Sequence, residues 1–468
     1  MPGQHGVEPR GLESSKDRRD QEGRFGFMFK RLPAFAPPDD LLLGLANTMR
    51  EPQGVPAEQT DNPDIPAGFT FLAQFLDHDL TLDRTPLDEQ QRDPGGIENF
   101  RSARFELDSV YGRGPAETPE LYDPNDRDKL LIAGLGDPNR PDDLPRGGDG
   151  RAIIGDSRND ENLIVCQLHV AFLKFHNAVV DRVRAQGSAP GAVFEEARRL
   201  TRWHYQWMVV HDFLPRVIGR DLLDRLLEER DGQPAKVRLD FYKPRNPNRP
   251  MMPVEFSVAA YRFGHSMVRP GYRMNAAAGG LFFGPTPTDR NLNGGRPIPP
   301  NLVVEWHNFF DLPGRPAPQP ARRIDSRLSL PLFTLPASVV PPPDPRVSLA
   351  ERNLLRGKRL ALPSGQRVAR EMGVPALSNA QLGLGDEAGW GGEAPLWYYM
   401  LKEAELGQGG RRLGPVGGRI VGEVFVGLIE RDQESYLRRD PRFRPAPPLA
   451  PVPGRFTMGD LLAFAGVV

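Results

Sequence analysis

The sequence has almost no cysteine, no excess of charge of either sign and no very long apolar run. Its 468 residues contain one cysteine, Cys166, so an internal disulfide is excluded. Lys and Arg total 60 and Asp and Glu total 61, giving a formal net charge of −1. This balance argues against a nucleic-acid binder, whose affinity comes from neutralising phosphates. No apolar run approaches the roughly 18 residues of a membrane helix, so we expect no membrane span.

The beginning of the sequence also lacks a recognisable export signal. Residues 1–24, MPGQHGVEPRGLESSKDRRDQEGR, are polar and contain no apolar segment of the secretory type. We therefore expect a disordered segment over residues 1–25 and a cytoplasmic protein, with export by another route left open. The sequence does not indicate an oligomeric state.

Proline and glycine are abundant, with 50 and 49 residues, and alternating apolar runs are few. This composition predicts a mainly α protein: one large helical domain over residues 26–468, with long Pro/Gly-rich loops and little β structure. Residues 31–66 are expected to be extended, residues 83–160 mostly loop, and residues 285–345 Pro-rich loop with short helical pieces. Helices are predicted at residues 67–81, from about 157 to 183, and at 192–216, 219–230, 253–269, 349–362, 394–405, 416–438 and in the closing TMGDLLAFAG.

The stretch QFLDHDLT, residues 74–81, places polar groups at the end of a helix built for burial. Gln74 and His78 are four residues apart and share one helical face. A histidine suits the negative end of a helix, whereas Asp77 and Asp79 do not. The two acids are therefore either solvated or explained by a cation or a covalent role.

A second stretch, GDSRNDE (residues 155–161), is predicted to begin the long helix, with Ser157 as its N-cap and an acid three residues later. Arg158 and Glu161 are three residues apart and project from one face. They form either a surface ion pair of little energetic worth or a charged pair directed into a site.

A third stretch, AAYRFGHSMV (residues 259–268), carries His265 in apolar surroundings. Gly264 beside it costs about 1 kcal/mol relative to alanine in a helix interior, which is understandable if a flat group must approach the backbone. His265 is either a hydrogen-bonded core residue or an axial haem ligand, with Arg262 as a propionate partner.

A fourth stretch, SARFELDSVYG (residues 102–112), alternates oxygen donors along an extended loop. Ser102, the carbonyl of Arg104, Glu106 and Asp108 can converge on one hard cation such as Ca²⁺, and Asp79 can add a further oxygen. The alternative is a solvated turn.

Together these stretches resemble the animal-type haem peroxidases of the peroxidase–cyclooxygenase superfamily, in a version that looks bacterial. FLAQFLDHDLT resembles the distal helix with His78 as distal histidine, and GDSRNDE resembles the segment of the catalytic arginine, here Arg158. YRFGH resembles the proximal helix with His265 as iron ligand, and SARFELDSVYG resembles the calcium loop. LLRGKRLALPSGQRVAREMGVP and LGPVGGRIVGEVFVGLIERDQESYL resemble C-terminal family segments, so the likeness runs from about residue 30 to the end.

The resemblance implies haem b and Ca²⁺ as cofactors. Asp77 and Glu161 match the acids that form esters with haem methyl groups, and Asp79 matches a calcium ligand. Asn162 stands where a few members carry a haem-linked methionine, so that third link is expected to be absent. Glu106 replaces the more usual aspartate of the calcium loop.

A second departure from the family pattern concerns the partner of the proximal histidine. Many members hold the proximal histidine with an asparagine, and the best-aligned residue in ALPSGQR is Ser364. Arg367, three residues later, is then expected to contact the cofactor. The alignment allows a shift of one residue, so the proximal partner stays open.

The implied activity is reduction of hydrogen peroxide with oxidation of a small donor, either a phenolic or aromatic compound or a halide or thiocyanate. His78 would transfer the proton, Arg158 would stabilise developing charge and Gln74 would orient the peroxide or a water. Neutral His78 is required for this role.

Three alternatives remain beside it. A fatty-acid dioxygenase of the superfamily needs a tyrosine three residues before the proximal histidine, where this chain has Arg262, and Tyr261 is expected to point elsewhere. The others are a catalytically silent haem-fold binding protein and a non-haem metal site of His78, Asp79 and His265. Structural roles are expected for the remaining histidines, including His169, His176, His204, His211 and His307.

Overall fold

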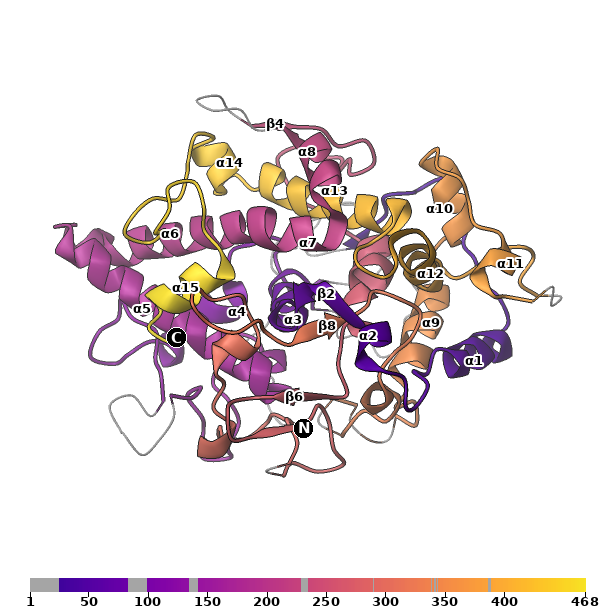
Figure 1. Cartoon of the computed structure of the whole chain (residues 1–468). Helices are drawn as coiled ribbons and strands as arrows, with labels where there is room; N and C mark the ends of the chain where they lie inside the picture. The colour runs from indigo at the N-terminus through magenta and orange to yellow at the C-terminus, as the bar shows by residue number, and fades with distance from the viewer. Residues whose placement is uncertain are drawn as a thin grey trace.

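The computed structural model describes residues 25–82, 99–133, 142–228, 235–288, 290–337, 339–340, 342, 344–385 and 389–468. Helices dominate this part of the chain (Figure 1), which confirms the predicted mainly α class. The α-helices are α1 (Asp39–Thr48), α2 (Ala57–Thr60), α3 (Gly68–Leu80), α4 (Asp108–Tyr111), α5 (Leu163–Ala185), α6 (Val193–Met208), α7 (Leu214–Ile218), α8 (Arg220–Leu226), α9 (Leu349–Arg359), α10 (Gly365–Glu371), α11 (Asn379–Leu382), α12 (Leu396–Gln408), α13 (Pro415–Arg431), α14 (Tyr436–Arg439) and α15 (Met458–Phe464).

The strands are short and occur in pairs. β1 (Phe25–Gly26) runs parallel to β5 (Met252–Pro253); the antiparallel pairs are β2 (Asp61–Pro66) with β8 (Pro320–Arg322), β3 (Leu227–Glu228) with β4 (Lys236–Val237), and β6 (Gly271–Arg273) with β7 (Gly279–Leu281). Among the described residues, the strands therefore form only two-stranded pairs and no larger sheet.

Helix α3 lies at the centre of the molecule, between α5 and α6 on one side and α9 and α12 on the other (Figure 1). Phe75 of α3 stacks on Phe172 of α5 with ring centroids 4.4 Å apart. Both rings are buried, and burial of large aromatic side chains provides much of the driving force for such packing. The predicted helix at 67–81 is confirmed and is the central element of the core.

The long helix α5 begins later than predicted. Residues Ser157–Asp160 form a 3₁₀ turn, η2, which is capped by Asp156 because its carboxylate accepts the N–H of Arg158. Asn162 is the N-cap of α5 and accepts the N–H groups of Ile164 and Val165. The proposed Ser157 cap was therefore wrong: two other polar side chains satisfy the free N–H groups at these helix starts.

Two predicted helices contain turns that are not α-helical. Helix α6 continues through a π-turn, η4 (Val209–Phe213), into α7. The segment predicted as a helix at 253–269 is a π-turn, η5 (Glu255–Ala259), followed directly by a 3₁₀ helix, η6 (Ala260–His265). Such turns frequently occur at functional sites. The other 3₁₀ helices are η1 (Pro119–Leu121), η3 (Pro190–Ala192), η7 (Pro300–Leu302), η8 (Trp306–Asn308) and η9 (Leu330–Phe333).

The proline-rich segment at 31–66 is not extended throughout, as the sequence suggested. It contains α1, which follows Pro38 and has Asp39 and Asp40 in its first turn. Acidic side chains stabilise the positive end of a helix, so this start signal was present in the sequence and was overlooked.

By length and composition alone, helix α5 could cross a membrane, contrary to the expectation that no apolar run is long enough. Its most apolar 18-residue window is 83% buried inside the protein. Within the described chain, α5 is therefore a core helix. The predicted disorder of residues 1–25 concerns a segment that, but for Phe25, lies outside the described residues.

Candidate active site

A cavity of about 330 Å³ lies between α3 and the segment formed by η5 and η6. His78 from α3 and His265 from the end of η6 both line it. Gly264 also lines the cavity, and a Cβ atom added there would lie 3.9 Å from its nearest neighbour, the Cβ atom of Ala73. The structure thus brings the two histidines predicted to act on a haem to one enclosed space.

His78 is held by a buried asparagine that the sequence analysis missed. Its Nδ1 donates to the Asn159 side-chain oxygen at 2.8 Å, and the Asn159 amide contacts His169 Nδ1 at 2.9 Å. Nε2 is then the ring nitrogen available to the cavity. Burial, and next the charge of Arg158, lower the pKa of His78 to about 4. The imidazole is therefore neutral at neutral pH.

Arg158 is fixed beside His78 by Asp156, another residue that the sequence analysis did not single out. The guanidinium donates to both Asp156 oxygens, at 3.0 and 2.7 Å, and to the backbone oxygen of His78 at 3.2 Å. Arg101 binds the same carboxylate from the other side. Burial alone would raise the pKa of Asp156, but the charges of Arg158 and Arg101 outweigh it and hold that pKa well below its ordinary value.

Gln74 is linked to the two residues that follow η2. Its amide nitrogen donates to Glu161 at 3.2 Å, and its oxygen accepts from Asn162 at 3.0 Å. Burial raises the pKa of Glu161 to about 7. Asp77 lies nearby, accepts the hydroxyl of Thr81 at 2.9 Å, and lines the cavity together with Gln74, Arg158 and Glu161. The expected grouping of these four residues is therefore present.

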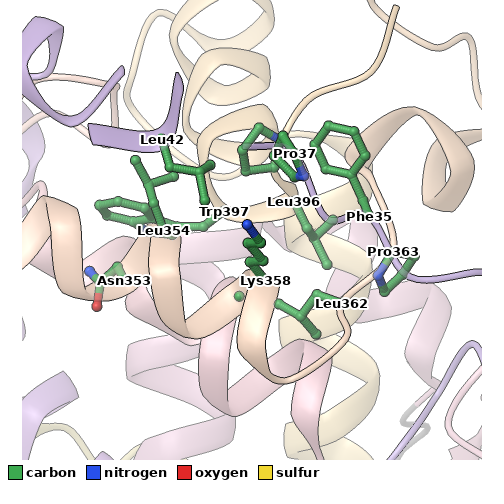
Figure 2. A pocket seen from close by; sticks show the side chains of 12 residues that line it. Phe35, Pro37, Leu42, Asn353, Leu354, Lys358, Leu362, Pro363, Leu396 and Trp397 are labelled. Carbon is green, nitrogen blue, oxygen red and sulfur yellow. The ribbon is translucent and has the colours of Figure 1, made fainter. Parts of the chain in front are cut away.

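His265 is held from α9 by Asn353, whose Nδ2 lies 2.8 Å from His265 Nδ1. Arg262 donates to the Asn353 oxygen at 3.1 Å and to the backbone oxygen of Ser257. Burial, and next the charge of Arg262, lower the pKa of His265 to about 3. Asn353 packs beside Leu354 and Trp397 at a small apolar pocket of about 20 Å³ (Figure 2).

The structure corrects the assignment of Ser364 and Arg367. Ser364 is the N-cap of α10, and Arg367 binds Glu393 at 2.8 and 2.7 Å. Neither residue lines the cavity. Asn353 and Arg356 have the same spacing of three residues eleven positions earlier, and Arg356 does line the cavity. The predicted pair lies one helix too late, in α10 instead of α9. Only the fold decides which of these two helices faces His265.

Three arginines meet at one end of the cavity. A second, smaller space of about 60 Å³ is lined by Arg158, Arg262 and Arg356, together with Asp77 and Thr81. It shares these arginines with the main cavity, so the two spaces adjoin. This end has an excess of positive charge suited to carboxylate groups.

The model of the family named animal haem peroxidase matches residues 98–379, which is more than half of the chain. The chain belongs to the animal haem peroxidase family. The match agrees with the resemblance stated above, since this range contains both η2 and the η5–η6 segment.

Curated peroxidases of animals are similar over parts of their length. A peroxidase-like protein of Margaritifera margaritifera is 32% identical over 184 residues, which cover 37% of this chain and 22% of that protein. The chorion peroxidase of Aedes aegypti is 25% identical over 314 residues, covering 66% of this chain and 37% of that protein. The chain thus spans well under half of either relative.

Solved structures of low identity share the fold of this chain. Peroxidase A of Dictyostelium discoideum superposes with a TM-score of 0.63 at 16% identity, over 93% of each chain. The fatty acid alpha-dioxygenase of Arabidopsis thaliana gives 0.56 at 15% identity, over 93% of this chain and 75% of that one. A peroxidase structure and a dioxygenase structure therefore both share this fold.

Tyr261 lines the cavity between His78 and His265, contrary to the expectation that it points elsewhere. Its hydroxyl donates to the backbone oxygen of Ala73 in α3 at 3.1 Å, and its ring stacks on Phe256. This bond joins the segment that carries His265 to the helix that carries His78. Tyr261 thereby fixes the spacing of the two histidines.

Only some of the residues predicted to bind calcium lie buried close to Asp79. Asp79 and Asp108 are fully buried, and burial, followed by the charge of Asp108, raises the pKa of Asp79. One Asp79 oxygen, Oδ1, and the Ser102 hydroxyl have no hydrogen-bond partner. Glu106 is only partly buried, and the Arg104 side chain lies 3.7 Å from Asp432. Among the described residues, no group of three or more His, Cys, Asp or Glu side chains is placed to hold a metal ion.

Proposed function

We propose that this protein binds haem b between His78 and His265 and reduces hydrogen peroxide while oxidising a small-molecule donor. One observation carries the proposal: two buried histidines reach one cavity from opposite segments, and an asparagine engages Nδ1 of each. That arrangement suits one histidine as iron ligand and the other as proton acceptor. Two histidines with purely structural roles would have no reason to face the same cavity.

The residues around the cavity fit haem. His265 would hold the haem iron, while Arg262 and Arg356 would bind the propionates at the positively charged end. Asp77 and Glu161 both line the cavity, which supports them as sites of ester linkage. Bound haem would supply an iron centre that exchanges electrons with peroxide.

The chemistry of the remaining residues follows from their geometry. Neutral His78 would take a proton from peroxide at Nε2 and return it to the oxygen that leaves as water. Arg158, immobilised by Asp156, would stabilise negative charge that develops as the O–O bond breaks. Gln74, oriented by Asn162, would position the peroxide or a water.

We further propose that calcium joins α3 to the loop at residues 102–108. The unpartnered Asp79 Oδ1 and Ser102 Oγ support this proposal, since buried polar atoms without a partner are costly in a folded protein. A divalent cation would also offset the repulsion between Asp79 and Asp108. The Arg104 carbonyl and Glu106 would complete the ligand set.

A fatty-acid dioxygenase is the second candidate, because the dioxygenase fold matches as well. Arg262, not a tyrosine, stands three residues before His265, and the hydroxyl of Tyr261 is engaged by Ala73. Both observations favour the peroxidase, with phenolic or aromatic compounds or a halide or thiocyanate as donors.

The absorption spectrum of the purified protein tests the proposal. We expect a Soret band that is lost in His265→Ala and kept in His307→Ala, a control at a partly exposed histidine outside the cavity. His78→Ala should retain haem and lose peroxide turnover by at least about 100-fold. Acid–acetone extraction before pyridine haemochrome analysis separates the cases: retained haem supports the esters at Asp77 and Glu161. Absence of a Soret band after expression with ample haem would refute the haem assignment.

A further inference from the structure

A second concavity, separate from the haem cavity, lies on the outer side of α6 and α7. It has a volume of about 700 Å³ and is bounded by η4, the start of α8 and the tail at residues 444–457. This tail runs past α6 on its way from α14 to α15 (Figure 1), and the Met458 N–H at the start of α15 binds Asp212. Among the described residues, none lines both this concavity and the haem cavity.

Arginines gather around this concavity from segments far apart in the sequence. They are Arg216, Arg220, Arg444 and Arg455. The single acid in the lining, Asp212, is buried and already accepts from Arg216 and from the Met458 N–H. The lining, here called the arginine cleft, thus carries an excess of positive charge.

Two of these arginines, Arg220 and Arg455, have no ion-pair partner among the described residues. Arg216 binds Asp212 and Asp311, so its charge is compensated. Arg220 and Arg455, by contrast, are exposed. Scattered surface arginines are usually only solvated. Here they border one concave space, where their repulsion would be relieved by an anion.

The floor of the arginine cleft is aromatic. Trp207 is 3% exposed and stacks on His211 with ring centroids 3.9 Å apart, while the Arg444 guanidinium lies 5.3 Å above the indole ring. The Trp207 indole N–H has no hydrogen-bond partner. His211 is partly exposed and extends this stack to the surface of the cleft. Burial, and next the charges of Arg220 and Arg444, lower the pKa of His211 to about 3, so it presents a neutral ring.

We propose that the arginine cleft is a second binding site, for an organic anion that combines a flat ring with carboxylate or phosphate groups. Guanidinium groups bind such oxyanions in a bidentate manner, and the ring would lie against His211. The volume of the cleft is that of a small-molecule site and exceeds the need of a single inorganic ion.

Calorimetric titration of the full-length protein, without peroxide, tests this site. The probes are phthalate, adenosine monophosphate and inorganic phosphate at constant ionic strength. We expect one equivalent of phthalate or of the nucleotide to bind, at least about tenfold more tightly than inorganic phosphate. Binding of phthalate alone assigns carboxylate as the recognised group, and binding of the nucleotide alone assigns phosphate. Equal affinity for all three probes, or no binding of either ring compound, would overturn the proposal.

Variants at exposed positions provide the matched control. Arg220→Gln combined with Arg455→Gln should weaken binding of the preferred probe at least about tenfold, because two charge-assisted contacts are lost. Arg225→Gln removes an exposed charge from the same helix, α8, outside the cleft, and should change affinity by less than about twofold. An equal loss in both proteins would indicate non-specific attraction and reject the site. The measurement is independent of haem, so failure of the proposed peroxidase activity would leave its outcome unaffected.

Discussion

At the scale of single residues, the chemistry of the site depends on neighbours that orient the reacting groups. His78 is held by Asn159, His265 by Asn353, and Arg158 by Asp156. Each neighbour is buried, so its hydrogen bonds are shielded from water and worth more than on the surface. The functional side chains are thereby placed before any ligand arrives.

Arg356 and Arg367 provide a direct test of the corrected assignment. We expect Arg356→Gln to weaken the binding of haem by about tenfold or more, because a charge-assisted contact of about 1.5–3 kcal/mol is lost. Arg367→Gln should leave haem affinity unchanged, since Arg367 pairs with Glu393 outside the cavity. Titration of haem into the haem-free protein, without peroxide, measures both. The reverse order of effects would restore the original assignment of Arg367.

At the scale of elements, α3 depends on close packing where it starts. The Gly68 N–H donates to the Phe309 oxygen at 2.8 Å, and the helix begins directly against the Phe309–Phe310 segment. Only a residue without a side chain allows this approach. The position of His78, three turns later, follows from this contact.

Glycine-to-alanine substitutions test this packing. In Gly68→Ala the new Cβ would lie 2.5 Å from the Phe309 oxygen and from the Phe310 ring, so we expect a loss of about 1–3 kcal/mol. The control is Gly44→Ala inside α1, where a Cβ would meet nothing within 4 Å. That variant should gain about 0.5–1 kcal/mol, because glycine is unfavourable in a helix interior. Urea unfolding distinguishes the two, and equal effects would contradict the packing argument.

A buried acid of α12 that contacts the start of α13 predicts a pH-dependent stability. Glu403 accepts the N–H of Val416, and burial raises its pKa to about 7. Because its pKa is raised in the folded protein, this carboxyl group binds more protons in the folded state than in the unfolded chain. Its contribution to folding stability therefore becomes unfavourable as pH rises from about 4.5 to 7. Relative to the parent protein, Glu403→Gln should therefore gain roughly 2–3 kcal/mol between pH 4.5 and pH 8. Denaturant unfolding at both pH values measures this, and a difference independent of pH would exclude the buried acid as its cause.

At the scale of the whole molecule, the fold brings together residues that are distant in the chain. Tyr261 joins η6 to α3, Asn353 joins α9 to η6, and Asp79 faces the loop around Asp108. The haem cavity therefore exists only when the central helix and the C-terminal helices are assembled, and its integrity reflects that of the domain.

Removal of calcium tests this coupling. If Ca²⁺ binds at Asp79 and the 102–108 loop, a free Ca²⁺ concentration of 100 times the dissociation constant should stabilise the protein by about 2.7 kcal/mol. This gain should raise Tm, and chelation of Ca²⁺ should reverse it. Asp79→Asn should abolish the response, while Asp149→Asn, at an exposed aspartate, should keep it. Thermal unfolding with and without Ca²⁺ measures this. A Tm that does not respond to Ca²⁺ in the parent protein would refute the calcium proposal.

The local patterns of the chain were sufficient for much of this description. The helix at 67–81 followed from its apolar periodicity, and the spacing of Gln74 and His78 placed both on one face. The start of α5 was misjudged, because several polar residues near it can serve as the cap and only tertiary packing selects one. Helix α1 was not predicted, although Asp39 and Asp40 in its first turn are a start signal. The π-turns in the predicted helices at 192–216 and 253–269 left no clear signal in the sequence.

The sequence by itself determined the fold class and the family, and it singled out Gln74, His78, Arg158 and His265, which line one cavity. Fold class, family resemblance and these candidates depend on local periodicity and on short motifs. Only the tertiary structure decided that Asn353 and Arg356, not Ser364 and Arg367, accompany His265, and that Asp156 and Asn159 orient the distal side chains. It alone also gathered the arginine cleft from two distant stretches, residues 207–220 and 444–457. The physical reason is that orientation, burial and charge clustering arise from long-range packing, which residue spacing along the chain does not specify.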